Sequence, residues 1–221
     1  MILKNSIISL LSLLLCITIT SCGAEAKNGK TSGGTPVINP NPSFWPPVIN
    51  KQYPDIELAN QDGRRTRLSQ FKGKVIIVEP IGMSCPACQA FAGANKPSVK
   101  PYGNCRPQSG LKSIDEILKQ YGGVSIDDPR IVLVQLLLYS PSMQAPSLKE
   151  GQAWAQNFGM KTQQNKYVLV GRSNMINQHS YNMIPGFQLI DKNFILRSDS
   201  TGHHPKNNLY THLLPMVKNL L

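Results

Sequence analysis

The sequence predicts an α/β protein with three layers, α/β/α, in which helices cover both faces of a mixed central sheet. The uninterrupted apolar run at residues 75–78 and the strongly apolar stretch at 131–139 are typical of strands that are buried on both faces. Helical patterns follow these runs at residues 86–95 and 147–158. A hairpin pattern at residues 186–196 and a last helical segment end the chain. Strands that alternate with helices in this way favour a layered α/β fold over an all-helical or all-strand one.

The other elements each have a sequence signal of their own. A hairpin with an Asp62-Gly63 turn precedes the first buried run, so the sheet is expected to carry an N-terminal hairpin extension. Ser147 and Glu150 have the spacing of a capping box, which starts the helix predicted at 147–158. The remaining predicted elements are the hairpin itself at 56–68, a helix at 112–121, a strand at 167–170, a helical turn at 173–179, and a helix at 206–221 that Pro215 bends or breaks.

Length and composition predict one folded domain with a basic surface. The 221 residues are 41% hydrophobic and 16% charged, which suits one well-filled core and leaves too little chain for a second full domain. Lys and Arg number 23 against 12 Asp and Glu, a net charge of +11. Because no compact basic run is interleaved with aromatic residues, the charge indicates a solvated surface and argues against nucleic-acid binding. An anionic lipid or a cell-surface polymer stays open as a partner.

The first 22 residues have the pattern of an export signal. Lys4 precedes an apolar run at residues 7–19, which is too short for a comfortable membrane span. The four residues that end at Cys22 resemble the lipobox of bacterial lipoproteins, in which the cysteine becomes the lipid-modified first residue of the mature protein. The alternative is a plain cleaved signal followed by an incidental thiol.

These features divide the chain into three parts. We expect a lipoprotein signal peptide at residues 1–21, a flexible tether rich in Gly and Pro at 22–51, and a folded domain at 52–221. The protein is therefore expected in the bacterial cell envelope, attached to a membrane by the lipid on Cys22 and facing the periplasm or the outside. A disulfide can persist in that compartment, so a pair of cysteines there can be redox-active or structural.

Two thiols three residues apart follow the first buried run. Cys85-Pro86-Ala87-Cys88 begins the helix predicted at 86–95, and Pro86 fits the first turn because its missing N–H does no harm there. The helix amides and the positive end of the helix dipole stabilise a thiolate at Cys85, which makes it the attacking sulfur, and Cys88 lies one turn away as the resolving thiol. The same spacing also serves zinc sites, so the rest of the chain has to decide between the two.

Three motifs occur in a fixed order: Phe71-Lys72-Gly73-Lys74, then the strand and dithiol, then Ile184-Pro185 before Phe187-Gln188-Leu189-Ile190-Asp191. With these motifs, residues 53–221 resemble the thioredoxin-like superfamily, especially its extracytoplasmic branch of TlpA-like, Sco-like and peroxiredoxin-like proteins. The resemblance implies a cis peptide bond at Pro185, facing the dithiol, and a hydrogen-bonding role for the backbone of Ile184 toward a substrate chain. Pro86 and Ala87 belong to the same expected substrate surface.

The resemblance also assigns a role to Glu79, six residues before Cys85. It matches the position at which thioredoxins carry a buried acid that moves protons to and from the resolving thiol. Burial should raise the pKa of such a carboxyl and favour proton exchange near neutral pH. The alternative is a Glu79 side chain that faces solvent or pairs with a lysine. The chain departs from the family at Met83-Ser84, which replaces the usual tryptophan and changes the expected docking surface.

The leading hypothesis is a lipid-anchored thiol–disulfide oxidoreductase. Cys85 would form a mixed disulfide with a client protein and Cys88 would resolve it. This chemistry needs no cofactor beyond the redox-active disulfide. The expected partners are cysteine-containing envelope proteins and a membrane electron donor or acceptor. Pro86 and Ala87 carry no charge that would stabilise the Cys85 thiolate further, which argues against a very strong oxidant, and the direction of electron flow stays open.

The second hypothesis is a Sco-like copper chaperone, in which Cys85, Cys88 and His179 would bind the metal. Thiolates suit Cu(I), and a histidine can complete a site for Cu(II). His179-Ser180 ahead of a Leu-Ile-Asp strand loosely resembles that family, but the cysteine spacing is shorter and the histidine spacing longer than in its pattern. The adjacent pair His203-His204 has no metal-ligand spacing to other residues.

Two further questions stay open at the sequence level. A peroxiredoxin-like peroxidase would use Pro80 and Ser84 ahead of Cys85, but the spacing does not match that family's proline-threonine-cysteine pattern. Cys105 lies in the loop predicted at 96–110, where it is either a further resolving thiol or an unpaired one. The sequence favours the unpaired interpretation.

Overall fold

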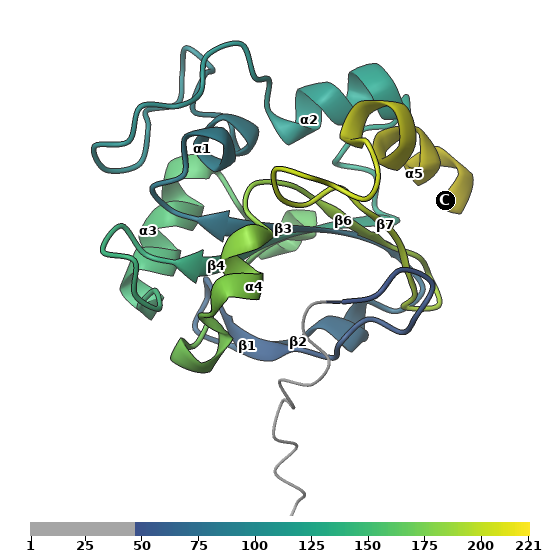
Figure 1. The fold of residues 1–221 in the computed structure, drawn as a ribbon, viewed down its shortest axis with the longest axis horizontal. Helices are drawn as coiled ribbons and strands as arrows, with labels where there is room; N and C mark the ends of the chain where they lie inside the picture. The colour runs from purple at the N-terminus through teal and green to yellow at the C-terminus, as the bar shows by residue number, and fades with distance from the viewer. Residues whose placement is uncertain (1–46) are drawn as a thin grey trace, which may run out of the picture. The chain divides into compact units, whose positions relative to one another are not determined.

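The computed structural model of the protein describes residues 47–221, in which seven strands form one mixed sheet with helices packed on it (Figure 1). The strand order is β2-β1-β5-β4-β3-β6-β7. The predicted signal peptide, Cys22 and most of the predicted tether lie outside the described residues. Within residues 47–221, no helix is both long enough and apolar enough to cross a membrane.

The strands are β1 (Glu57–Asn60), β2 (Arg65–Arg67), β3 (Val75–Gly82), β4 (Ile131–Tyr139), β5 (Lys166–Val170), β6 (Gln188–Ile190) and β7 (Leu196–Asp199). Strands β3, β4 and β5 are parallel, while β1 and β6 join them antiparallel from the two sides. The predicted mixed sheet and its N-terminal β1–β2 hairpin are therefore confirmed.

The centre of the sheet is the pair β3–β4, in which every residue is buried. The register pairs Val75 with Ile131 and continues to Ile81 opposite Leu137. Continuous runs of β-branched and leucine side chains give strands that can be covered on both faces, so the two apolar runs of the sequence become the two central strands. Both strands end at the same edge of the sheet, where the functional residues lie.

The helices are α1 (Pro86–Ala92), α2 (Ile114–Ile117), α3 (Leu148–Phe158), α4 (Gln178–Asn182) and α5 (Leu214–Leu220), with short 3-10 helices at Leu68–Phe71, Thr162–Gln164 and Ser173–Met175. A π-helical turn, Leu118–Gly122, continues α2, and another, Leu209–Leu213, leads into α5. The capping box predicted for α3 is present, since Glu150 accepts a hydrogen bond from the Ser147 N–H at 2.7 Å and donates its own N–H to the Ser147 hydroxyl at 3.2 Å.

The helices cover the two faces of the sheet unequally. Helices α1, α2, α3 and α5 contribute to one hydrophobic cluster, which includes Phe91, Ile117, Trp154 and Val217. The opposite cluster is closed by the segment around Tyr53, by the 3-10 helix Leu68–Phe71 and by residues just before α4. The fold is layered as predicted, but its second helical layer consists of short helices and N-terminal chain. In Figure 1, the β1–β2 edge of the sheet lies below the central strands, while α1, α2 and α5 lie above them.

Two of the helix ends that differ from the predicted bounds have identifiable reasons. Helix α1 stops at Ala92 rather than at residue 95, because Gly93 adopts a left-handed conformation with φ of 112° and ends it. The last helix begins at Leu209, where the Asn208 side chain caps it, and Pro215 does not break it. Pro215 instead lies in the first turn of the α-helical part, directly after the π-helical turn, where its missing N–H breaks no regular bond.

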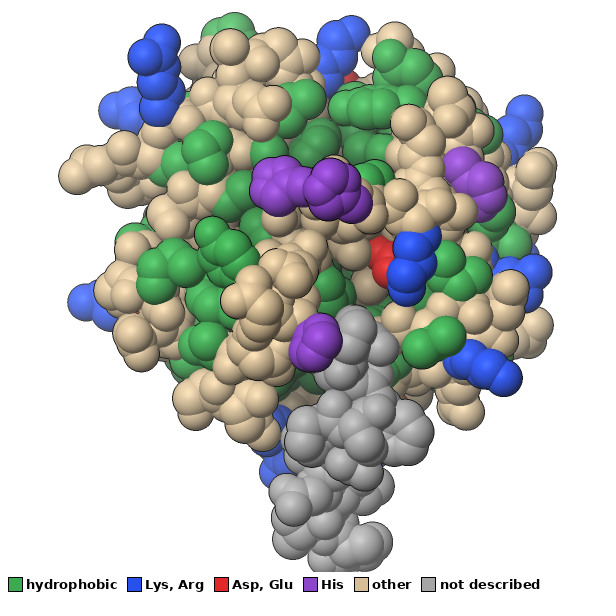
Figure 2. Space-filling view, viewed as in Figure 1, with side chains coloured by type: hydrophobic (Ala, Val, Ile, Leu, Met, Phe, Trp, Pro, Cys, Tyr) green, Lys and Arg blue, Asp and Glu red, His purple; other side chains and the backbone are tan. Residues whose placement is uncertain are grey.

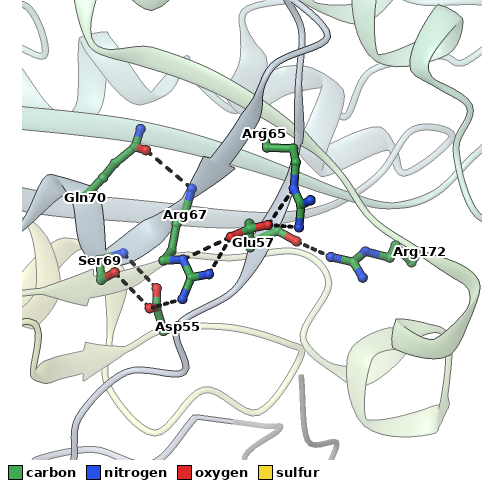
Figure 3. A network of polar contacts seen from close by, with 7 residues as sticks. All are labelled: Asp55, Glu57, Arg65, Arg67, Ser69, Gln70 and Arg172. Atoms are coloured by element: carbon green, nitrogen blue, oxygen red, sulfur yellow. Dashed lines mark hydrogen bonds and ion pairs between the residues drawn. The ribbon is translucent and has the colours of Figure 1, made fainter. Parts of the chain in front are cut away.

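A polar network fixes the N-terminal hairpin to the body of the fold (Figure 3). Glu57 on β1 accepts hydrogen bonds from Arg65 at 2.7 Å and from Arg67 at 3.0 and 2.6 Å, and these partners lower the pKa of its carboxyl. Arg172 donates to the Glu57 carbonyl, so the network also reaches the segment after β5. Exposed ion pairs of this kind contribute little to stability individually, and the network mainly fixes the register of the hairpin.

Candidate functional site

The two thiols of the dithiol lie where β3 ends and α1 begins. Cys85 is the N-cap residue of α1, and its Sγ accepts the N–H of Cys88 at 3.3 Å. Pro86 occupies the first helical position, as expected for a residue without an N–H. Cys85 is half-buried and Cys88 is completely buried, and both are free thiols. One sulfur therefore faces the outside while the other lies behind it in the core.

This arrangement separates the acidities of the two thiols. The Cys88 thiol donates to the Cys85 sulfur, and the N–H groups of Cys88 and Ala87 add to this, so that the pKa of Cys85 falls to about 7. Burial raises the pKa of Cys88 well above its ordinary value, and the hydrogen bond to Cys85 and the Cys85 charge raise it further. Cys85 is consequently the thiolate, and Cys88 stays protonated.

The lowered pKa of Cys85 predicts its reactivity toward an alkylating reagent. In the reduced protein, the rate at which iodoacetamide modifies Cys85 should reach half its maximum at about pH 7, whereas an ordinary thiol does so at about pH 8.5. Peptide mass spectrometry at a series of pH values measures this rate for Cys85 separately from the other cysteines. Cys88→Ala removes the principal donor and should move the midpoint upward. A wild-type midpoint at or above that of an ordinary thiol would contradict the prediction.

Glu79 lies on β3 and has no exposed surface. One carboxyl oxygen accepts a hydrogen bond from the Gln135 side-chain amide at 3.1 Å, and Gln135 in turn accepts the indole N–H of Trp154 at 2.9 Å. The other carboxyl oxygen has no partner. Burial raises the pKa of Glu79 well above its ordinary value, and the Cys85 charge adds to the rise, while the bond from Gln135 opposes it. The predicted burial of Glu79 is confirmed, and the alternative with a solvent-facing or lysine-paired Glu79 is wrong.

The third predicted part of the site is Ile184-Pro185, whose peptide bond is cis. It borders a cleft of about 360 Å³ that is also lined by Cys85, Pro86 and Ala87. These five residues come from two segments about 100 residues apart in the chain, which the antiparallel pairing of β6 with β3 brings together. The structure thus joins the predicted substrate-binding residues at the exposed sulfur, while Glu79 and Cys88 lie behind them in the core.

Comparisons with known proteins agree with this architecture. No protein-family model matches the chain, and no curated protein matches it in sequence. A solved structure from Bacteroides thetaiotaomicron, provisionally named a protein disulfide isomerase, superposes with a TM-score of 0.51 at 16% identity, covering 79% of this chain and 90% of that one. The fold is thioredoxin-like.

Two further solved structures are similar at lower scores. The thioredoxin domain of a thiol-disulfide oxidoreductase from Bacteroides vulgatus gives a TM-score of 0.47 at 13% identity, over 77% of this chain and 98% of that one. A SCO1/SenC family lipoprotein from Bacillus anthracis gives 0.49 at 20% identity, over 77% and 95%. Structural likeness at such identity describes the fold, so the activity of this protein has to be argued from its own site.

The cleft is also lined by side chains that the sequence did not identify as site residues. They include Met143 and Tyr181, which are 46% and 53% exposed, and His203. Met143 adopts a left-handed backbone conformation, with φ of 61°, which a long side chain rarely does. Figure 2 shows hydrophobic and histidine side chains near the centre of the face it draws, while most of the Lys and Arg side chains lie toward the edge. The cleft therefore presents apolar groups to whatever approaches Cys85.

The histidine named by the copper hypothesis is placed differently. His179 lies in α4 and is not among the residues that line the cleft beside Cys85. Within residues 47–221, no three His, Cys, Asp or Glu side chains gather closely enough to hold a metal ion. Cys85, Cys88 and His179 therefore do not form a three-ligand set in this thioredoxin-like fold. A different histidine, His203, lines the cleft together with Cys85.

Proposed function

We propose that this protein is a thiol–disulfide oxidoreductase that exchanges disulfides with client proteins through Cys85 and Cys88. The asymmetry of the two thiols carries the proposal. Cys85 is half-exposed at an apolar cleft and has a pKa of about 7, while Cys88 is buried, protonated and in direct contact with it. A structural zinc site would instead need four ligands of similar character around one point.

The chemistry follows from this geometry and balances without a cofactor. The Cys85 thiolate attacks a client disulfide, a bond forms between Cys85 and one client sulfur, and the other client sulfur leaves as a thiolate. Cys88 then loses its proton and attacks the Cys85 sulfur, which expels the second client sulfur and leaves a Cys85–Cys88 disulfide. The client gains the two electrons that the dithiol loses. The reverse sequence oxidises a client dithiol.

Glu79 supports the second step. Its charge is close enough to raise the pKa of the Cys88 thiol, so the two groups compete for one proton in the same buried region. An ionised Glu79 can accept the Cys88 proton as Cys88 attacks, and a protonated Glu79 can return it when Cys88 is released. Both side chains are completely buried, so neither exchanges its proton directly with solvent.

We further propose that the protein works in the bacterial cell envelope, attached by lipid on Cys22, with residues 22–51 as a tether. The support is the sequence pattern at Lys4, in the apolar run and at Cys22. Its partners would be cysteine-containing envelope proteins and a membrane electron donor or acceptor that restores the dithiol or the disulfide. The copper alternative is less well supported, because His179, the histidine of its ligand set, does not line the cleft beside Cys85.

A matched pair of variants of the full chain tests the oxidoreductase. Cys88→Ser/Cys105→Ser leaves only Cys85 at the site, and Cys85→Ser/Cys105→Ser leaves only Cys88. With oxidised glutathione at pH 7, the first variant should accumulate a mixed disulfide on Cys85, and the second should form it at least about 100-fold more slowly, because its thiol is buried and protonated. Mass spectrometry of the intact protein and its peptides measures both. Equal rates, or no adduct on Cys85, would refute the proposal.

A further inference from the structure

The loop between α1 and α2 is held against the dithiol by a buried glutamine. The Gln89 side chain, one residue after Cys88, has no exposed surface. Its amide N–H groups donate to the carbonyls of Met83 at 2.7 Å and Tyr102 at 3.0 Å, and its oxygen accepts the Tyr102 N–H at 2.8 Å. One side chain thus ties the loop at Tyr102 to the turn that precedes Cys85. A fully satisfied buried amide fixes both segments firmly.

A second anchor lies six residues further along the loop. The Gln108 N–H donates to the Pro86 carbonyl at 3.0 Å, and the Gln108 carbonyl accepts the Asn95 side-chain amide at 2.7 Å. Tyr102 and Gln108 are therefore both fixed to the beginning of α1. The short span between them crosses the surface beside the dithiol, and it contains Cys105.

Cys105 is directed at the residue before Cys85. Its thiol donates to the Ser84 carbonyl oxygen at 3.3 Å. Because that oxygen is about 2.8 Å from the Cα of Cys85 across one trans peptide bond, the Cys105 sulfur lies within about 6 Å of the Cys85 Cα. A disulfide needs an S–S distance of about 2 Å, so the Cys105 loop and the Cys85 side chain have to move toward each other, and the anchors at Tyr102 and Gln108 keep Cys105 beside Cys85 for that movement.

The charges at the site support contact between these two thiols. Burial raises the pKa of the Cys105 thiol, and the negative charge of Cys85 raises it further. When Cys85 is bonded to a client sulfur, its charge is gone and this second contribution disappears. Cys105 thus becomes more acidic at the stage at which a resolving thiol is needed. Cys88 is completely buried, whereas Cys105 is only half-buried.

We propose that Cys105 is a second resolving thiol that attacks the mixed disulfide on Cys85 from the surface side, opposite the buried Cys88. This rests on the proposed oxidoreductase function. The Cys105 sulfur bonds to the Cys85 sulfur, the bond from Cys85 to the client breaks, and the client sulfur leaves as a thiolate that takes up the proton lost by Cys105 to solvent. The product is a Cys85–Cys105 disulfide with Cys88 still a thiol, and Cys88 can then displace Cys105 to give the Cys85–Cys88 disulfide.

The test compares three variants of the full chain after reaction with oxidised glutathione. In Cys88→Ser, the glutathione adduct on Cys85 should disappear at least about tenfold faster than in Cys88→Ser/Cys105→Ser, and a Cys85–Cys105 disulfide should replace it. Chymotrypsin separates the two cysteines by cleaving after Phe91 and Tyr102. Trypsin does not, because Lys96 and Lys100, the basic residues between them, each precede a proline. The linkage is therefore assigned by mass spectrometry of chymotryptic peptides.

The third variant distinguishes a positioned thiol from any nearby one. Ser109→Cys in the Cys88→Ser/Cys105→Ser background places a thiol on the same loop beyond the Gln108 anchor, and its adduct on Cys85 should persist. Rapid loss of that adduct, or equal persistence in Cys88→Ser and in the double variant, would overturn the role of Cys105. Absence of any adduct in the double variant would refute the oxidoreductase function as well, so the two failures are distinguishable.

Discussion

Replacing Glu79 by glutamine is expected to raise the free energy of unfolding at neutral pH, by an amount that grows with pH. The carboxyl is completely buried, one of its oxygens has no partner, and its pKa in the folded protein is well above the ordinary value. The stability that the neutral carboxyl contributes is fully present below its unfolded pKa of about 4.3 and is lost as pH rises toward the folded pKa.

The size of the effect follows from proton linkage. Between these two pKa values, the unfolded chain binds one proton fewer than the folded protein, so the wild type should lose about 1.4 kcal/mol of unfolding free energy per pH unit relative to Glu79→Gln. Urea unfolding of both reduced proteins from pH 5 to pH 8 measures the difference. Glu57→Gln is the control, because the pKa of Glu57 is lowered by its arginine partners, so this variant should not gain stability as pH rises. Parallel curves for wild type and Glu79→Gln would contradict the prediction.

Local sequence signals predicted the parts of the fold that local interactions determine. The apolar run at 131–139 became β4 with the same bounds, and the capping box at Ser147 placed the start of α3. The segments that cover the other face of the sheet, opposite α1, α2, α3 and α5, were harder to predict. This covering depends on how the N-terminal segment and the 3-10 helix Leu68–Phe71 fold back under the sheet, which the pattern of a single segment does not contain.

The site divides in the same way. Cys85 and Cys88 could be predicted from their spacing at a strand–helix junction, whereas Glu79 and Pro185 were predicted only because their positions resemble those of functional residues in thioredoxin-like proteins. Met143 and His203 reach the cleft from loops that are distant in the chain, and neither carries a spacing that predicts this. Gln135 did leave a signal, since it is the one polar side chain between Ile131 and Leu138, and a polar residue in a doubly buried strand needs a partner.

Replacing Trp154 is expected to lower the free energy of unfolding strongly, because its side chain packs in the core and also hydrogen-bonds to Gln135, the partner of Glu79. The Trp154 side chain has no exposed surface, and its ring lies 4.5 Å from that of Phe158 and 5.4 Å from that of Tyr102, measured between centroids. Trp154→Ala should cost about 3 to 5 kcal/mol of unfolding free energy, as is usual when a large aromatic side chain is removed from a core. Trp154→Phe keeps most of the apolar contact but leaves the Gln135 oxygen without its donor, which should cost about 1 to 3 kcal/mol. Urea unfolding of the three proteins at one pH measures both losses.

Trp154→Phe also separates the contribution of Trp154 to core packing from its effect on the pKa of Glu79. In the wild type, the indole N–H occupies the Gln135 oxygen and so directs the Gln135 amide N–H groups toward Glu79, which lowers the pKa of the carboxyl against the effect of burial. Without the indole donor, that amide is free to turn its oxygen toward the protonated carboxyl, which stabilises the neutral form and raises the pKa of Glu79 further. The free energy of unfolding of Trp154→Phe should therefore fall, relative to that of Trp154→Phe/Glu79→Gln, over a pH range that extends higher than the range found for wild type against Glu79→Gln. An unchanged range would show that Trp154 acts on the core by packing alone and leaves the proton on Glu79 to Gln135.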